Sequence, residues 1–372
     1  MIEIPALLKT GGCEVDIFCA EGSWAIQNSF HDKWVKAPAG EQEFVDELLS
    51  LINNTQYDWI IPGDDIIVRL LNERITDEQL FYKIMPLTKI ENRELLGSKA
   101  GFSNLCMKYG IKTPGYLIYE EGMQAGEIGR KVGFPALMKV DKSEGGYGIF
   151  LCENEQDITS NLAKITNKEN LVIQQMINGY DVNVEVLYKD GELMVYNYSK
   201  TTMAMGQFGV STQRLFYSNP EIEEVLVHAG RSLGLSGFCN VVFMYDEAKK
   251  EHFLIEIDSR PNAWMYYGKF TGNDFSEAVR KIIKKDLTLV KQPDEYKNKQ
   301  ITISLYKKDV YRCIINKDMG GLMKWVLNMN NNRRYIPYYD KRLLKACNKY
   351  LYESFAELFT HKVKKLTRPA TD

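Results

Sequence analysis

The sequence predicts a chain of mixed α/β and α+β class, and three observations lead to this prediction. Short apolar runs alternate with polar helical stretches in the first third of the chain. A glycine-rich turn then joins two short strands, and an Asp-Gly turn separates two longer alternating strands. With 372 residues, 45% of them hydrophobic, the chain is long enough for roughly two or three compact domains.

Composition excludes several classes of function. The 47 Lys plus Arg and 49 Asp plus Glu give a net charge of -2, so no global field favours nucleic acid as a partner. Charges interrupt the apolar stretch at 59–71 well before the roughly 20 residues that cross a bilayer, so no membrane span is expected. Residues 1–12 do not resemble a secretion signal, and we expect a cytoplasmic protein.

Cysteines and histidines carry no recognisable motif. The seven cysteines are scattered and never form Cys-x-x-Cys, which indicates reduced thiols in the core. No His-x-x-x-His pair and no Gly-x-Ser-x-Gly sequence is present. Neither a zinc site nor a serine hydrolase is therefore favoured.

The N-terminal part shows a βαβ pattern: a strand at Glu14–Cys19, a helix at Gln42–Ile52 and a second strand at Asp58–Ile61. Asp64 and Asp65 follow that second strand, at the edge where α/β folds place ligands. These acids either face a cleft or cap the helix that follows, and both alternatives stay open. No Gly-x-Gly-x-x-Gly sequence is present, which argues against a dinucleotide site.

The remaining elements follow from apolar periodicity and turn residues. Helices are predicted over 92–109 (one helix or a pair), 125–132 and 222–233. Strands are predicted over 136–140, 149–152, 171–175, 181–188, 192–199, 239–245 and 252–257. Residues 287–372 are rich in Lys, Asn and Tyr and show no recognisable chemistry, so we expect a small helical appendage or a partner surface.

The first chemical motif is a strand that ends in Lys139 and precedes the glycine-rich segment 143–148. Glycines allow successive backbone N–H groups to turn toward a phosphate, and a lysine adds a point charge. The motif predicts a site for a nucleoside triphosphate. The alternative is an ordinary flexible hairpin with an exposed lysine.

The second motif is a strand in which Glu256 and Asp258 lie on one face, because side chains alternate along a strand. Two carboxylates at this spacing suit Mg²⁺ that bridges nucleotide phosphates, and Arg260 beyond them can neutralise a phosphoryl group or an anionic intermediate. The alternative is a surface strand whose charges face water. The apolar opposite face, which includes Ile255 and Ile257, favours a central strand instead.

Together, these motifs resemble the ATP-grasp superfamily over roughly residues 14–285. The resemblance is to its ligases that join a carboxylate to an amine or thiol. It implies an ATP-grasp fold preceded by a Rossmann-like domain, with boundaries as follows: a pre-ATP-grasp α/β domain at 1–90, the ATP-grasp domain at 91–286, and a C-terminal appendage at 287–372. Within the ATP-grasp domain, a small lid subdomain at about 112–170 would precede a larger sheet subdomain at 171–286.

The resemblance also assigns nucleotide-binding residues. Lys99 and Lys139 would hold the α- and β-phosphates of ATP. A mobile loop would close on the β- and γ-phosphates, formed by Glu144, Gly145, Gly146, Tyr147 and Gly148. In the hinge, backbone groups of Gln174 and Ile177 would recognise adenine and Asp181 would hold the ribose; the hinge also includes Gln175 and Met176. The alternative is that Met176 and Ile177 are simply core residues.

The resemblance is less complete at the metal. Glu256, Asp258 and Arg260 match the Glu-x-Asn-x-Arg strand of the family, with aspartate in place of asparagine. On the preceding strand, Val242 falls where the family commonly has another metal ligand. Either Asn240 supplies the oxygen after a register shift, or one Mg²⁺ site is weakened or absent.

The resemblance implies an ADP-forming ligase that joins a small carboxylate, expected to be an amino acid, to an amine through an acyl phosphate. ATP and Mg²⁺, or Mn²⁺ in its place, would be required. Arg260 and Arg214 would be catalytic, Arg214 by binding a carboxylate of the acceptor; alternatively Arg214 forms a surface salt bridge. A homodimer is left open.

The sequence leaves two other functions open. A catalytically silent nucleotide-binding partner protein is suggested by Val242 and by the unassigned C-terminal segment. Carbamoyl-phosphate chemistry is a weaker alternative, because that likeness is confined to the strands at 239–260 and the chain is far too short.

Overall fold

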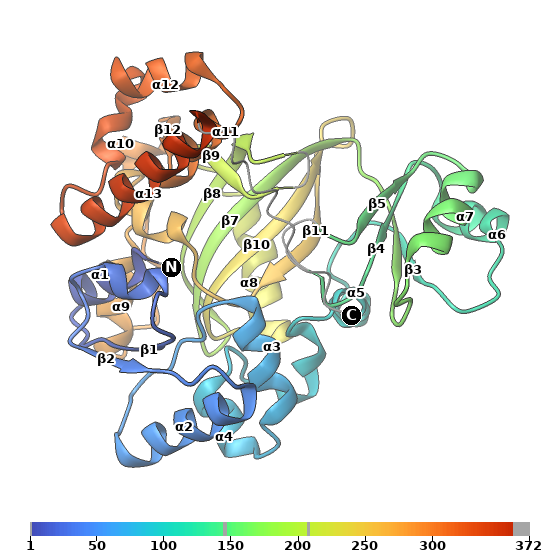
Figure 1. The fold of residues 1–372 in the computed structure, drawn as a ribbon. Coiled ribbons are helices and arrows are strands. Elements are labelled where there is room, and N and C mark those ends of the chain that lie inside the picture. Colours follow the sequence, from blue (N-terminus) through green and yellow to red (C-terminus); the bar gives the residue numbers. More distant parts are fainter. Residues whose placement is uncertain (1, 144–146, 207–208, 360–372) are drawn as a thin grey trace.

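The computed structural model describes residues 2–143, 147–206 and 209–359 (Figure 1). The predicted loop residues Glu144, Gly145 and Gly146 lie outside these described ranges. Helices and sheets are mixed, as predicted. A large twisted sheet occupies the centre of the molecule, with a smaller sheet at one side. In the view of Figure 1, α2 (Glu41–Asn54) and α4 (Glu78–Ile84) lie below the large sheet, and α12 (Met319–Val326) and α13 (Lys341–Phe359) lie at its upper left.

The central sheet has the strand order β11-β10-β7-β8-β9-β12, and each neighbouring pair is antiparallel. Its strands are β7 (Gly179–Lys189), β8 (Glu192–Ala204), β9 (Ser211–Phe216), β10 (Gly237–Asp246), β11 (Glu251–Asp258) and β12 (Ile301–Ser304). The predicted Asp-Gly hairpin joins β7 to β8, and both Asp190 (φ 52°) and Gly191 (φ 85°) adopt the left-handed conformation that such a two-residue turn requires.

One face of the central sheet is apolar and the other is largely polar. Valines at alternate positions of β7 and β10, such as Val182, Val184 and Val241, are fully buried in one core with Leu226 and Leu233 of α8 (Ile222–Leu233). Since side chains alternate along a strand, the intervening residues of these strands project from the opposite face. That opposite face carries the predicted metal ligands.

The smaller sheet has the order β3-β6-β4-β5 and is covered by two helices. Its elements are β3 (Tyr116–Ile118), α6 (Ala125–Val132), β4 (Ala136–Lys139), β5 (Ile149–Cys152), α7 (Glu155–Lys164) and β6 (Val172–Gln175). Ile128, Met138 and Ile158 are fully buried in its core. Because β6 pairs with both β3 and β4, the strand that we expected to begin the larger subdomain lies in this small sheet.

The N-terminal part differs from the predicted βαβ unit. It contains α1 (Ile4–Gly11), β1 (Asp16–Cys19), η1 (Trp24–Gln27), β2 (Lys33–Lys36), α2 (Glu41–Asn54), α3 (Asp65–Arg74), α4 (Glu78–Ile84), η2 (Ile90–Leu95) and α5 (Lys99–Lys108). The predicted strand at Asp58–Ile61 is wrong: this segment is irregular, and the parallel partner of β1 is β2. Trp59 instead stacks on Phe238 of β10, with 5.3 Å between ring centroids. The apolar side chains of this segment therefore pack against the central sheet.

Beyond β11 come η3 (Ala263–Phe270), α9 (Phe275–Ile283), α10 (Asp294–Lys297), β12, α11 (Tyr306–Ile315), α12 (Met319–Val326), η4 (Met329–Tyr335) and α13 (Lys341–Phe359). The predicted helices of the C-terminal segment are present. The sequence did not indicate β12, a four-residue strand that pairs with β9 and extends the central sheet. The C-terminal segment is therefore joined to the main sheet by backbone pairing.

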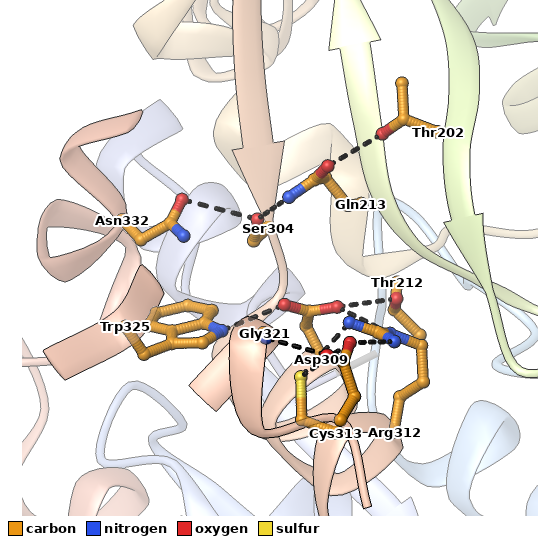
Figure 2. A network of polar contacts seen from close by, with 11 residues as sticks. Thr202, Thr212, Gln213, Ser304, Asp309, Arg312, Cys313, Gly321, Trp325 and Asn332 are labelled. Atoms are coloured by element: carbon orange, nitrogen blue, oxygen red, sulfur yellow. Dashed lines mark hydrogen bonds and ion pairs between the residues drawn. The ribbon is translucent and has the colours of Figure 1, made fainter. Parts of the chain in front are cut away.

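A network of polar contacts also fixes this segment to β9 (Figure 2). The carboxylate of Asp309 accepts hydrogen bonds from Thr212 Oγ1 (2.8 Å), Arg312 Nε (3.0 Å) and Trp325 Nε1 (2.9 Å). Next to it, Gln213 donates to Ser304 Oγ of β12 at 2.9 Å.

All seven cysteines are free. In the described ranges, no helix combines the length and apolarity that crossing a bilayer would require.

Candidate active site

Two cross-strand rows of side chains form the predicted metal site on the polar face of the central sheet. In the first row, Asn240 of β10 lies opposite Asp258 of β11 on one side and opposite Glu185 of β7 on the other. In the second row, Val242 lies opposite Glu256. Directly opposite residues in antiparallel strands have neighbouring side chains on the same face. The structure thus brings together the two predicted carboxylates and the amide, with Glu185 as an additional carboxylate.

The register explains how this chain departs from the family pattern. Val242 faces Glu256 directly and offers no oxygen. Asn240 reaches Asp258 without any slip, because the irregularity between β10 and β11 falls after Val242. Among the described residues, neither Asn240 Oδ1 nor Glu185 Oε2 has a hydrogen-bond partner, although both atoms are buried. Buried oxygens without partners are costly, and they are suitable ligands for a hard cation.

These residues fit Mg²⁺ that is held jointly by protein and nucleotide. In the part of the chain that the structure describes, no group of three or more His, Cys, Asp or Glu side chains is arranged to hold a metal alone. Mg²⁺ is commonly bound by one or two carboxylates plus substrate phosphates. Glu256 and Asp258 are the candidate carboxylates, with Asn240 Oδ1 as a further oxygen.

Arg260 connects this site to the N-terminal part of the chain. Its guanidinium lies 2.6 Å from Asp65 Oδ2 and 3.1 Å from Asp258 Oδ2. Burial acts to lower the pKa of Arg260, but the charges of Asp258 and Asp65 outweigh it and raise that pKa. Burial, together with the charge of Glu256, raises the pKa of Asp258 to about 8, and the charge of Arg260 opposes the rise. A cation bound here would relieve the crowding of the two carboxylates.

Lys139 is the last residue of β4, and its Nζ donates a hydrogen bond to Gln174 Oε1 at 2.6 Å. Burial lowers the pKa of Lys139 to about 8; the charge of Glu256 opposes this decrease and that of Lys99 adds to it. The pKa of Lys99 is also lowered, mainly by burial, with Glu256 again opposing. The two predicted phosphate ligands therefore lie in the electrostatic field of the predicted metal site.

Lys99 is positioned by the loop that precedes the glycine-rich segment. It begins α5, and its backbone N–H donates to Asp141 Oδ1 at 2.6 Å, while Ser98 caps the helix through a hydrogen bond from the Gly101 N–H. Its Nζ donates to the backbone carbonyl of Ser143 and lies 3.1 Å from Ser143 Oγ. Lys99 therefore joins α5 to the start of the loop. Gly148, at the far end of that loop, has a φ of 72°.

The predicted adenine hinge lies between β6 and β7. Gln175 and Met176 use their backbone N–H groups in bonds to Gly115 and Pro135, of 2.8 and 3.0 Å. Ile177 is buried and makes no backbone-to-backbone hydrogen bond with any residue in the described ranges, so its peptide groups are free for the predicted contact with a base. Asp181, the predicted ribose ligand, accepts a bond of 3.2 Å from Asn183 Nδ2.

Arg214 is buried in the polar face instead of forming a surface salt bridge. Its Nη1 lies 2.5 Å from Glu185 Oε1, its Nη2 donates to Asn183 at 2.9 Å, and its Nε donates to Ser211 Oγ at 2.7 Å. The guanidinium also lies over the ring of Trp264, 4.6 Å from its centroid. Burial lowers the pKa of Arg214, and Glu185 opposes the decrease. Its predicted role toward an acceptor carboxylate stays a prediction.

The part of the chain that carries these residues is similar to known proteins. Residues 97–264 match the sequence profile of the ATP-grasp domain. The chain contains an ATP-grasp domain. The match begins just before Lys99 and ends after Arg260, so it spans the lysines, the hinge and the acidic strand.

Solved structures share the fold of the ATP-grasp domain and its surroundings at low sequence identity. The biotin carboxylase domain of 2-oxoglutarate carboxylase from Hydrogenobacter thermophilus, in complex with MgADP, ADP and bicarbonate, has a TM-score of 0.59 and 18% identity, and the match covers 76% of this chain and 66% of that one. An L-amino acid ligase from Bacillus licheniformis has a TM-score of 0.56 and 15% identity, with 75% and 71% covered.

A curated relative, phosphoribosylamine–glycine ligase of Clostridium acetobutylicum, is 24% identical over 188 residues, which cover 48% of this chain and 43% of the relative. The chain spans under half the length of the curated relatives that it matches.

Sequence reasoning missed Glu185 of the candidate site and left the role of Asp65 open between a cleft and a helix cap. Glu185 belongs to Asp181-Val-Asn-Val-Glu185-Val, in which polar residues alternate with valines; this period of two indicates that the polar residues share one face. Of the two adjacent acids, only Asp64 caps α3 with its side chain. The carboxylate of Asp65 accepts a hydrogen bond from Arg260 instead.

Proposed function

We propose that this protein is an ADP-forming ligase that activates a small carboxylate, an amino acid, as an acyl phosphate and transfers the acyl group to an amine. The observation that supports it best is the convergence of Glu256, Asp258 and Arg260 with Lys99 and Lys139 on one side of the central sheet. Such a cluster combines carboxylates for a metal with cations for phosphates. The names of two similar proteins, a glycine ligase and an L-amino acid ligase, agree with this class of reaction.

The reaction needs neither a cysteine nor a serine nucleophile. A carboxylate oxygen of the substrate attacks the γ-phosphorus of ATP, and the bond to the β-phosphate oxygen breaks to release ADP. The amine nitrogen then attacks the acyl carbon, phosphate leaves, and the amine loses a proton to solvent. When bound, Mg²⁺ supplies charge neutralisation at the phosphates. The protein contributes by position and charge: the lysines hold phosphates, and Arg260 stabilises the transferring phosphoryl group or the anionic intermediate.

Mn²⁺ is proposed as a substitute for Mg²⁺, since the same oxygen donors suit both metals. We also propose a cytoplasmic location, where ATP is abundant and where free thiols such as the seven of this chain stay reduced.

The proposal is tested by ADP formation from ATP and Mg²⁺ in the presence of pools of amino acids and amines. Glu256→Gln is expected to lower the rate of ADP formation by at least about 100-fold, since it removes charge from the metal site. A matched control is Glu251→Gln on the same strand, because Glu251 is paired with Lys112 at 2.6 Å on an exposed surface. The control should keep the wild-type rate. Unchanged ADP formation in the Glu256 variant would overturn the metal assignment.

The second candidate is a silent nucleotide-binding partner protein, and the position of Val242 opposite Glu256 favours it. Its signature in the same assay is tight ATP binding with no ADP release in any pool. ADP release that depends on an amino acid would exclude it.

A further inference from the structure

The C-terminal segment places a lysine at the polar face of the central sheet. Helix α11 is fixed on β9 at two points: the Leu305 N–H donates to the Thr212 carbonyl at 3.0 Å, and Asp309 accepts from Thr212 Oγ1 at 2.8 Å (Figure 2). Thr212 is two residues from Arg214, and residues two apart on a strand face the same side. The first turn of α11 therefore lies beside Arg214.

Lys308 and Lys307 on this turn have different surroundings. The ammonium of Lys307 lies over the indole of Trp24, 3.5 Å from its centroid. Lys308 is half-buried and lies in the electrostatic field of Arg214, Arg260 and Glu3. Burial lowers the pKa of Lys308 to about 8; Glu3 opposes the decrease, and the two arginines add to it. Within the described part of the chain, Lys308 forms no ion pair, so its charge has no direct counter-ion.

The two arginines near Lys308 are already paired with acids. Arg214 is paired with Glu185 at 2.5 Å, and Arg260 is paired with Asp65 and with Asp258. Lys308 is consequently the cation of this group that remains available for an anionic ligand.

Glu3 supplies an acid with a free oxygen. It is the N-cap residue of α1, but its side chain makes no capping hydrogen bond, and its Oε2 is buried with no hydrogen-bond partner among the described residues. Ile4, the residue after Glu3, packs in the same core as Tyr266. In agreement with this position, burial raises the pKa of the Tyr266 and Tyr339 hydroxyls and the charge of Glu3 adds to both shifts. Their rings lie 4.9 Å apart. A buried carboxylate oxygen with no donor is unfavourable unless a ligand supplies one.

We propose, on the basis of the ligase function above, that Lys308 and Glu3 recognise a zwitterionic α-amino acid: Lys308 binds its carboxylate and Glu3 binds its ammonium group. The carboxylate then lies on the side of Arg260, toward the predicted phosphate site. An ammonium held by a carboxylate stays protonated and is no nucleophile. The amino acid bound in this way is therefore the acid that is activated, and the amine partner comes from elsewhere.

The test measures binding to the full chain in the presence of Mg²⁺ and a non-hydrolysable ATP analogue, by titration calorimetry. The probes are matched pairs with and without an amino group: L-alanine and propionate, and L-phenylalanine and 3-phenylpropionate. The wild type should bind at least one amino acid about tenfold or more tightly than its partner, since an ion pair with Glu3 is gained. Glu3→Gln should abolish that preference.

Variants of the two adjacent lysines provide the matched control. Lys308→Met should weaken binding of both members of a pair by about tenfold or more, and Lys308→Arg should restore part of the loss, because the charge returns. Lys307→Met removes the same charge one residue away; because Lys307 also lies in the field of Glu3 but has its ammonium over Trp24, the loss should be clearly smaller than that in Lys308→Met. Affinity for the ATP analogue should be unchanged in every variant, which also shows that each one is folded.

The proposed recognition by Lys308 and Glu3 would be overturned if Lys307→Met and Lys308→Met weakened amino acid binding equally. It would also be overturned if Glu3→Gln kept the full preference for the probe that carries an amino group. Failure of the wild type to bind any amino acid probe would overturn it too, while ADP release with other carboxylates would leave the ligase proposal standing. Conversely, amino acid binding that follows the predicted pattern without any ADP release would support the pair and contradict the ligase.

Discussion

Arg260 and Asp65 form an ion pair of 2.6 Å between Nη2 and Oδ2, although 195 residues separate them in the sequence. Asp65 is the first residue of α3, and Arg260 follows β11. Since Arg260 also contacts Asp258 at 3.1 Å, its guanidinium joins the N-terminal part of the chain to the predicted metal site. Asp65 therefore brings the start of α3 to the predicted metal site.

Asp65→Asn should lower the kcat of ADP formation, because Arg260 loses the partner that holds it in place. We expect a loss of about 10- to 100-fold with a smaller change in KM for ATP, since an interaction at the reacting centre is displaced. Asp65 acts here through Arg260 and is a positioning residue. Steady-state kinetics with ATP and the amino acid varied separately would measure the change in kcat and the change in KM.

The neighbouring acid is the control for this variant. Asp64 caps α3 by accepting a hydrogen bond from the Ile67 N–H at 2.8 Å. Asp64→Ala should lower the free energy of unfolding by about 1 kcal/mol and leave kcat unchanged. The opposite pattern, with kcat sensitive to Asp64 and not to Asp65, would contradict the role given to the ion pair.

Nucleotide binding should weaken as pH rises through about 8, where the pKa of Lys139 lies. Burial lowers this pKa, so the lysine is charged at pH 7 and loses its proton above pH 8 in the free protein. Phosphates favour the charged form, and each pH unit above the pKa should therefore weaken binding by up to about tenfold. Affinity for an ATP analogue measured between pH 7 and 9 would show the trend.

Lys139→Arg isolates this effect, because an arginine stays charged across the whole range. Its nucleotide affinity should depend less on pH between 7 and 9 than that of the wild type. Identical pH profiles for the two proteins would show that Lys139 is not the group that titrates.

The strands that carry the motifs could be predicted from sequence because their patterns are local. Alternating apolar residues located β10 and β11, and the Asp-Gly turn located the hairpin of β7 and β8. The period of two was sufficient to place Glu256 and Asp258 on one face. The pairing of Val242 with Glu256 became visible only in the register of the structure.

The remaining contacts depend on pairing between distant segments, which no local pattern shows. Asp65 meets Arg260 across 195 residues, and Asp309 meets Thr212 across 97. The segment at Asp58–Ile61 has the composition of a strand, yet Trp59 packs on Phe238. Burial against another domain and burial within a sheet leave the same apolar signature in a sequence.

The ion pair of Arg214 with Glu185 should be important for stability as well as for the site. Arg214→Met leaves the fully buried Glu185 carboxylate without its main partner, so we expect the free energy of unfolding to fall by about 3 to 5 kcal/mol. Adding Glu185→Leu to this variant should recover part of the loss, because the unpaired charge is removed. Chemical denaturation of the single and double variants would measure both values. Strictly additive losses would contradict the coupling.

The polar network at Asp309 should determine whether the C-terminal segment stays docked on the sheet (Figure 2). Asp309→Ala removes the acceptor of three hydrogen bonds and leaves the buried Trp325 Nε1 and Thr212 Oγ1 without it. We expect the free energy of unfolding to fall by about 2 to 4 kcal/mol.

Hydrogen exchange would show whether this loss is local. It should accelerate in β12 and α11 before it changes in the small sheet, because the segment is held by these contacts and by the pairing of β12 with β9. Glu353→Gln is the control, because the contact of Glu353 with Lys349 is 3.8 Å long and exposed. Its free energy of unfolding should change by no more than about 0.5 kcal/mol.

Docking of the C-terminal segment also positions Lys308, so Asp309→Ala should weaken amino acid binding while the affinity for the ATP analogue persists. Uniform acceleration of exchange across the whole chain would contradict a docking role and indicate global destabilisation.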